Sequence, residues 1–121
     1  KFLDANSCKN TNARFEAKST IALAFSHDGT LFASTHGDHT VKVFKAETWT
    51  RKCVLRGHLR TPWSVKFHPS NPRILASGSL DLNVMVWDVD LGTCIVMHDF
   101  PIVVSCISFH SSGNMIAVTS G

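Results

Sequence analysis

One stretch of the chain decides its fold: Gly57–Asp88, which reads GHLRTPWSVKFHPSNPRILASGSLDLNVMVWD. Three short apolar segments lie within it, and in each of them apolar residues tend to alternate with polar or small ones. The segments are Ser64–Phe67, Ile74–Gly78 and Val84–Trp87. Turn-forming residues separate them, with Asn71-Pro72 in the first gap and Asp81–Asn83 in the second. Alternation with period 2 between turns predicts a three-stranded antiparallel meander.

Several polar residues interrupt this apolar stretch at positions that a folded sheet would bury. A buried polar group costs roughly 1–3 kcal/mol unless it is hydrogen-bonded. Asp81 can accept a hydrogen bond from the imidazole of His58. That imidazole can link to the hydroxyl of Ser77 or Ser79, which can accept from the indole N–H of Trp87. We therefore predict that these residues form a structural hydrogen-bond network.

The same residues resemble a complete unit of the WD-repeat family, which is one blade of a β-propeller. The resemblance rests on Gly57-His58 at the start, Asp81 in the tight turn and Trp87-Asp88 at the end, in that order and spacing. It implies an all-β fold built from successive four-stranded blades. It also implies that copies of the stretch recur along the chain.

Copies of the stretch do recur. Three phenylalanines that each end an apolar run lie 42 residues apart: Phe25, Phe67 and Phe109. Asp38 lies six residues before Phe44, as Asp81 lies six residues before Trp87, so Asp38 is the predicted counterpart of Asp81. The earlier copy is degenerate, because Phe44-Lys45 stands in place of Trp-Asp.

The repeat divides the chain into four parts. These are a polar linker at 1–19, with a candidate closing strand at 14–17, a first blade at 20–58, a second blade at 59–100 and an incomplete third blade at 101–121. The predicted strands are 20–25, 31–35, 41–44, 52–55, 64–67, 74–78, 84–87, 93–97, 103–109 and 115–119. A closed propeller has about four to eight blades. We therefore expect a partial propeller, whose remaining blades belong to a larger or split ring and come from the same chain or another one.

Composition is that of a folded domain rather than a disordered tail, with 44% apolar and 17% charged residues. No apolar run has the length of a transmembrane helix. The four cysteines show no CxxC spacing, and Cys53, Cys94 and Cys106 fall in predicted strands, where buried thiols are expected. Cysteines without a disulfide framework favour an intracellular location, the cytoplasm with the nucleus as the alternative.

Basic residues are segregated, although the net charge is only +3. Residues 40–73 contain one acid, Glu47, and eight basic residues: Lys42, Lys45, Arg51, Lys52, Arg56, Arg60, Lys66 and Arg73. A basic surface of this kind could bind an acidic protein or RNA. Solvated charge on outer strands is the simpler interpretation, because strand alternation spreads these side chains over several faces. Nucleic acid is also disfavoured because aromatic residues do not interleave with the basic ones.

Serine, histidine and aspartate in one blade could also suggest a hydrolase. The chain lacks the G-x-S-x-G nucleophile elbow, and the spacing of the three residues fits the structural network better. His36–His39 brings possible metal ligands close together, yet these residues occupy the turn that corresponds to the Asp81 turn. There is no glycine-rich phosphate loop. We predict a protein that is not an enzyme and that has no metal or cofactor.

The loop Gly57–Pro62 connects the outer strand of one blade to the inner strand of the next. In the WD-repeat family this loop and the turn around Asp81 lie on the face that most often binds partners. Trp and Arg are enriched at interaction hot spots, and loops on a rigid scaffold concentrate binding residues. The predicted partner-binding residues are Arg60, Thr61, Trp63 and His36. For Trp63, core packing at the start of a strand is the alternative.

Less generic strings within Lys18–His36 and Gly57–Pro69 resemble the amino-terminal blades of the Ambra family, the activating molecule in Beclin-regulated autophagy. This resemblance implies a split propeller that serves as a substrate receptor of a cullin-RING ubiquitin ligase and as a scaffold in autophagy control. Its implied partners are the ligase adaptor, substrates and autophagy factors.

One position departs from that pattern. Many receptors of this class carry Trp-Asp-x-Arg for docking the ligase adaptor, whereas this chain has Asp90 two residues after Asp88. The acid in place of arginine argues against docking by that route. The alternative function is a structural WD-repeat subunit of another multiprotein assembly.

Overall fold

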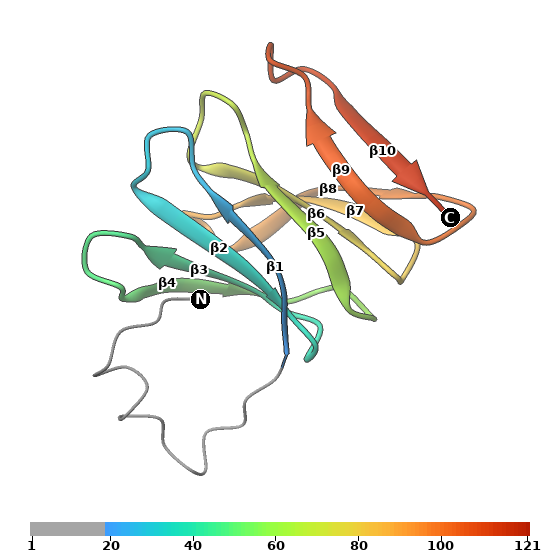
Figure 1. Cartoon of the computed structure of the whole chain (residues 1–121), viewed down its shortest axis with the longest axis horizontal. Helices are drawn as coiled ribbons and strands as arrows, with labels where there is room; N and C mark the ends of the chain where they lie inside the picture. Colours follow the sequence, from blue (N-terminus) through green and yellow to red (C-terminus); the bar gives the residue numbers. More distant parts are fainter. Residues whose placement is uncertain (1–18) are drawn as a thin grey trace.

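A computed structural model describes residues 19–121 of the chain, and within them every regular element is a β-strand (Figure 1). Ten strands form three antiparallel sheets that lie side by side. The fold is therefore all-β, as predicted, and its arrangement is that of a partial propeller. Apart from Ser19, the predicted linker and its candidate closing strand lie outside the described residues.

The first sheet, called the first blade below, is a meander in the order β1-β2-β3-β4. Its strands are β1 (Thr20–Phe25), β2 (Leu31–His36), β3 (Val41–Lys45) and β4 (Arg51–Leu55). Ala33 of β2 lies opposite Val43 of β3, which in turn lies opposite Cys53 of β4. Lys52 is left without a partner in this register, so β4 carries a bulge there.

The second sheet, called the second blade, repeats this arrangement in the order β5-β6-β7-β8. Its strands are β5 (Pro62–Phe67), β6 (Ile74–Ser79), β7 (Asn83–Asp88) and β8 (Thr93–Asp99). Ala76 lies opposite Val86, 43 residues after the Ala33–Val43 pair of the first blade. The strands β5 and β8 are each two residues longer than the sequence predicts, at the start of β5 and at the end of β8.

The third sheet has two strands, β9 (Val104–Phe109) and β10 (Ile116–Ser120), paired antiparallel. Glycine at Gly78 lets this sheet approach β6 closely, because a Cβ added there would collide with the side chain of Val104. The third sheet thus packs directly on the backbone of the second blade.

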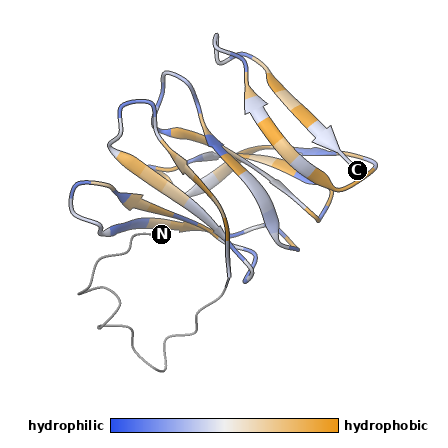
Figure 2. Ribbon diagram, in the orientation of Figure 1, coloured by the Kyte–Doolittle hydropathy of each residue, from blue (hydrophilic) through white to orange (hydrophobic). Residues whose placement is uncertain are grey.

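Two apolar layers hold the three sheets together. The first lies between the two blades and includes Ala33, Val43, Leu75 and Trp87, all at most 1% exposed. The second lies between the second blade and the third sheet and includes Ala76, Val84, Val104 and Ile107. Figure 2 shows that hydrophobic segments follow the strands and hydrophilic ones the turns.

The first strand of each sheet lies inside the assembly, since β1 contacts β5 and β5 contacts β9. The strands β4 and β8 are the last of their sheets and lie on the outside (Figure 1). Among the cysteines, Cys53 and Cys94 are half-buried but Cys106 is exposed. The expectation of a buried thiol is wrong for Cys106, because its side chain lies on a face of the third sheet that no other described sheet covers.

Candidate functional site

A chain of hydrogen bonds crosses the loop end of the second blade. The indole Nε1 of Trp87, on β7, donates to Ser77 Oγ of β6 at 2.8 Å. Ser77 Oγ lies 2.7 Å from Nε2 of His58, in the β4–β5 connection. His58 Nδ1 lies 2.8 Å from Oδ2 of Asp81, in the β6–β7 turn. Four segments that are separate in the sequence are thereby joined through side chains that are almost fully buried.

The partners of the ring indicate its protonation. The ionised carboxylate of Asp81 can only accept, so Nδ1 of His58 carries the hydrogen and donates to it, and the neutral ring accepts at Nε2 from the hydroxyl of Ser77, which itself accepts from Trp87. The imidazole is neutral in this arrangement. Burial lowers the pKa of His58 below 6.5, although Asp81 acts in the opposite direction.

The carboxylate of Asp81 is held ionised by its donors. Burial alone would raise the pKa of Asp81, but hydrogen bonds from His58 and from the backbone N–H of Leu59 and Asn83 lower it overall. These bonds measure 2.8 Å, 2.9 Å and 2.9 Å. A buried, neutral imidazole beside an ionised carboxylate with this many donors is a structural link between the β4–β5 loop and the β6–β7 turn.

Ser79 has a different role from Ser77. Its Oγ donates to the backbone carbonyl oxygens of Arg60 and Thr61, both at 3.0 Å, and accepts from the backbone N–H of Asp81 at 3.1 Å. Of the two serines considered from the sequence, only Ser77 therefore links histidine to tryptophan. Ser79 instead anchors the β4–β5 loop to the end of β6.

These contacts fix the β4–β5 loop at several points. Leu59 N–H donates to Asp81 Oδ2, and Leu80 N–H donates to the carbonyl oxygen of Thr61 at 3.1 Å. The backbone of the loop is held from inside the blade while two side chains point outward, because Arg60 is exposed and Leu59 is 79% exposed. The loop is therefore a rigid platform for outward-facing side chains.

Four connections lie at this same end of the sheets, because alternate turns of a meander share one end. They are residues 37–40, 56–61, 80–82 and 100–103, and together they are called the loop face below. The N–H of Phe100 donates to the carbonyl oxygen of Leu82 at 2.7 Å, which joins the last two of them. The loop face is thus a continuous surface across the second blade.

The predicted partner-binding residues lie at this end but differ in exposure. Arg60 is exposed, Thr61 is half-buried, and Trp63 is 49% exposed at the start of β5. His36 is half-buried, with Nε2 2.7 Å from Ser34 Oγ, and burial lowers the pKa of His36. His36 therefore bonds to a serine of its own strand, and only part of its side chain is accessible to a partner.

The contacts of Asp38 with the described residues are local. Its Oδ1 accepts from Thr40 Oγ1 at 2.6 Å and from Thr40 N–H at 3.2 Å, and its Oδ2 lies 3.8 Å from Lys42 Nζ. Within residues 19–121 it reaches no histidine of a neighbouring connection by hydrogen bond. The turn geometry of the second blade is present in the first, but the described part of the chain contains no hydrogen bond that links Asp38 to another strand.

Sequence reasoning missed three apolar side chains on the loop face. Leu59, Leu82 and Ile102 are 79%, 39% and 50% exposed. Leu82 also has a positive φ of 76°, which is unfavourable for a residue with a Cβ. An apolar residue directly after Asp81 in a tight turn was a signal available in the sequence, because turns of this kind favour polar residues or glycine.

Several of the basic residues are neutralised by acids at the other end of the sheets. Lys52 Nζ lies 3.0 Å from Asp90 Oδ1, and Arg73 Nε lies 2.7 Å from Asp88 Oδ2 and 3.8 Å from Asp90 Oδ2. Arg60 forms no ion pair within residues 19–121. The positive charge of Arg60 on the loop face is therefore not balanced by an acid of the described residues.

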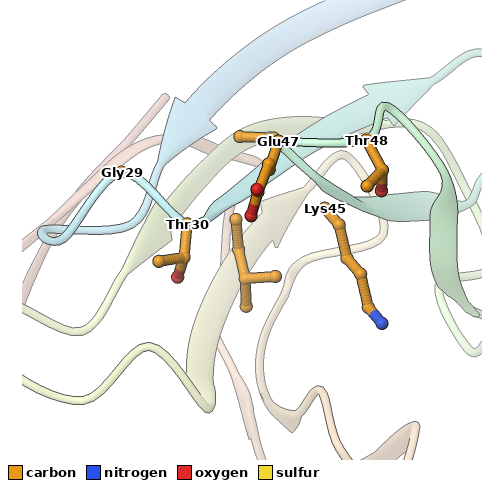
Figure 3. A pocket seen from close by; sticks show the side chains of 7 residues that line it. Gly29, Thr30, Lys45, Glu47 and Thr48 are labelled. Carbon is orange, nitrogen blue, oxygen red and sulfur yellow. The ribbon is translucent and has the colours of Figure 1, made fainter.

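A shallow hollow lies at the opposite end from the loop face, between the β1–β2 and β3–β4 turns (Figure 3). Lys45 and Glu47 line it with opposite charges, together with the hydroxyls of Thr30 and Thr48. Its polar groups do not converge on one point in Figure 3. In residues 19–121 there is no group of three or more His, Cys, Asp or Glu side chains placed to hold a metal ion.

Comparison with known proteins assigns the family. A family model described as "WD domain, G-beta repeat" matches residues 8–45 and 49–88. The chain belongs to the WD-repeat family. The first matched unit of this WD-repeat chain includes β1–β3, and the second includes β4 of the first blade with β5–β7 of the second blade and ends on the buried Trp87-Asp88. Proteins of this family bind other proteins, so the loop face is a candidate protein-interaction surface.

Relatives of this WD-repeat chain include two kinds of protein. It is 37% identical over 105 residues to two zebrafish (Danio rerio) proteins, activating molecule in BECN1-regulated autophagy protein 1B and protein 1A. It is 33% identical over 103 residues to eukaryotic translation initiation factor 3 subunit I of Aspergillus terreus. The match covers 85% of the chain and 8% of the autophagy proteins, and 84% of the chain and 30% of the initiation-factor subunit. Residues 19–121 contain no helix of the length and apolarity needed to span a bilayer.

Proposed function

We propose that this chain is the protein-binding part of an Ambra-type scaffold that acts in autophagy control, as the substrate receptor of a cullin-RING ubiquitin ligase in the cytoplasm. Similarity to the two zebrafish autophagy proteins over 85% of the chain supports this assignment. The observation that carries the binding role is the anchored β4–β5 loop, whose backbone is fixed by Ser79 and Asp81 while Arg60 points outward. No step of chemistry on a bound molecule is assigned to the chain.

The loop face suits an acidic partner that also carries apolar side chains. Arg60 supplies a cation without an internal ion pair in the described residues, and Leu59 and Trp63 supply exposed apolar area beside it. Arginine and tryptophan contribute most to binding where neighbouring contacts exclude water. Because the loop is already rigid, little conformational entropy is lost when a partner binds.

The test is affinity purification of the intact protein from its own cells, followed by mass spectrometry. Wild type is expected to recover the cullin adaptor together with substrates, and Arg60→Glu is expected to lose the substrates and keep the adaptor. Arg51→Glu is the matched control, because Arg51 is an exposed arginine at the opposite end of the sheets. Absence of the adaptor from the wild-type sample would contradict the ligase role. Equal recovery of all partners by Arg60→Glu would remove the loop face from the binding site.

A structural subunit of another assembly is the second candidate, and similarity to initiation factor 3 subunit I supports it. Asp90 also favours it, since this acid occupies the place of the docking arginine and already pairs with Lys52. In the same purification, this function predicts a stoichiometric set of other subunits without the cullin adaptor.

A further inference from the structure

The outer strand of the second blade, β8, has an open edge. It is the last strand of its sheet and pairs only with β7, so the outward backbone N–H and C=O groups of β8 have no strand partner in residues 19–121. Such a row of groups is a template for another strand. With seven residues, β8 is also the longest strand of the described part of the chain.

The corresponding strand of the first blade, β4, has a protected edge. It begins with Arg51-Lys52, and charged residues on an edge strand oppose pairing with another chain. Both strands carry a bulge at the same point of the repeat, where Lys52 stands in β4 and Ile95 in β8. The bulge of β4 therefore carries a charged residue, whereas the bulge of β8 carries an apolar one.

Three consecutive apolar residues of β8 are solvent-exposed. Ile95, Val96 and Met97 are 51%, 55% and 60% exposed, although neighbours in a strand point to opposite faces. Both faces of this strand are thus accessible near its edge. A neighbouring blade can cover a face of β8, but the hydrogen-bonding edge points outward in the plane of the sheet, away from the neighbours on either side.

We propose that β8 pairs antiparallel with β8 of a second copy of this chain, which gives a two-fold symmetric dimer with one continuous eight-stranded sheet. The pairing satisfies the outward backbone groups of both strands and buries Ile95, Val96 and Met97 of each copy between the two blades. An interface of this kind is closed, because the same strand is used by both copies.

Charge is compatible with a second β8 as the occupant. The titratable side chains of the strand, His98 and Asp99, stand at its last two positions, and antiparallel pairing places the two copies of them at opposite ends of the joined strands. Asp99 then faces the start of the partner strand, around Thr93. That end of β8 lies beside Asp88 and Asp90, whose charges are balanced by Arg73 and Lys52. Like charges are therefore not opposed, as they would be in a parallel pair.

The proposal is tested by sedimentation equilibrium of the intact protein, wild type against Ile95→Lys. The substitution gives β8 the residue that β4 already has at the corresponding bulge, so the fold tolerates it there. Wild type is expected to dimerise reversibly, and Ile95→Lys is expected to weaken the dimer about tenfold or more. Leu91→Lys is the matched control, since Leu91 is 66% exposed but lies in the turn before β8, and its dimer should be unchanged.

A second measurement reports on the strand itself. Hydrogen exchange of the amides of residues 93–99 should slow as the wild-type concentration rises and should not change with concentration in Ile95→Lys. A wild-type protein that stays monomeric overturns the proposal and leaves the edge to a different protein. Association that survives Ile95→Lys but is lost in Leu23→Lys would also overturn it, because the contact would then lie on the exposed face of β1.

Discussion

The two blades share strand order and register but differ in what holds their loop ends. In the second blade, hydrogen bonds run from Trp87 through Ser77 and His58 to Asp81 and tie β6, β7 and the turn between them to the β4–β5 loop. In the first blade, Ser34 occupies the position of Ser77 but bonds to a histidine only two residues away in the same strand. Ser34 therefore bonds within its own strand, whereas Ser77 joins β6 to β7 and to the β4–β5 loop.

The difference between the blades distinguishes the residues that pack the sheets from those that fix a loop. Packing of the sheets is done by apolar pairs such as Ala33–Val43 and Ala76–Val86, which both blades have. The polar network is a separate feature, and within residues 19–121 it is present only in the second blade. Its effect is to fix the β4–β5 loop, and a blade that carries such a network can present side chains to a partner without first ordering its loop.

Removing a member of the network should have the largest effect. His58→Ala and Asp81→Ala each leave buried partners without hydrogen bonds, and each is expected to lower the free energy of unfolding of the intact protein by about 1–3 kcal/mol. Urea denaturation measures the change. His36→Ala in the first blade is the matched control and should cost less, because His36 is half-buried and bonds to one neighbouring serine.

The experiment tests whether His58→Ala lowers the free energy of unfolding more than His36→Ala does. If His36→Ala destabilises the protein as much as His58→Ala does, the local bond of the first blade is equivalent to the network of the second. The two blades would then differ in the geometry of these hydrogen bonds but not in the stability that the bonds contribute.

A smaller effect is expected in the turns between the third and fourth strands. Trp49 and Gly92 occupy equivalent positions, with φ of 58° and 70°, and each donates its N–H to the residue four positions earlier. The second blade uses glycine at this left-handed position, whereas the first carries a tryptophan. Gly92→Ala should cost about 1 kcal/mol from backbone strain alone, because a Cβ there meets no atom within 4 Å.

The reciprocal comparison is Trp49→Gly against Trp49→Ala, which both remove the indole and its contacts, and their free energies of unfolding should differ by less than the cost of Gly92→Ala. Relief of strain in the folded state is partly offset by the greater freedom of glycine in the unfolded chain. Urea denaturation of these variants decides the matter. A neutral Gly92→Ala would mean that the turn relaxes to a negative φ without loss.

The fold could be predicted from the sequence because its signals are local. Alternating apolar residues, turn residues and the 42-residue spacing of Phe25, Phe67 and Phe109 predict strands that the structure contains with shifts of at most two residues at their ends. The ends themselves were less predictable. Pro62 and Asp99 extend β5 and β8 because neighbouring strands supply partners for them, and such partners are not visible in a single segment.

The candidate site was only partly predictable. Spacing restricted the network hydroxyl to Ser77 or Ser79, but the choice depends on which side chain points toward His58, and this is set by the pairing of β6 with β5 and β7. The exposure of Leu59 and Leu82 depends in the same way on the bonds that hold their loops. The open edge of β8 required a comparison with β4 at matched register, which a sequence read without strand pairing does not provide.

The smallest expected effect is a pH dependence of stability that differs between the blades. Burial lowers the pKa of His58 in the folded state, whereas the unfolded imidazole titrates near 6.5. Below that pH the unfolded chain binds more protons than the folded one, so stability is greatest above about pH 6.5 and falls as the pH decreases through it. His36 acts in the same direction, and Asp81 adds nothing in this range because its pKa lies below 3.8.

Urea denaturation at pH values from about 7.5 to 5.5 measures this dependence in wild type, His58→Gln and His36→Gln. Both substitutions remove a titrating ring and should flatten the profile, and His58→Gln should flatten it more, because His58 is 6% exposed and His36 is only half-buried. The effect is small near pH 7 because few unfolded imidazoles are protonated there. A profile unchanged by His58→Gln would show that the folded protein binds the proton as readily as the unfolded chain. The neutral ring between Ser77 and Asp81 would then be the wrong description of the second blade.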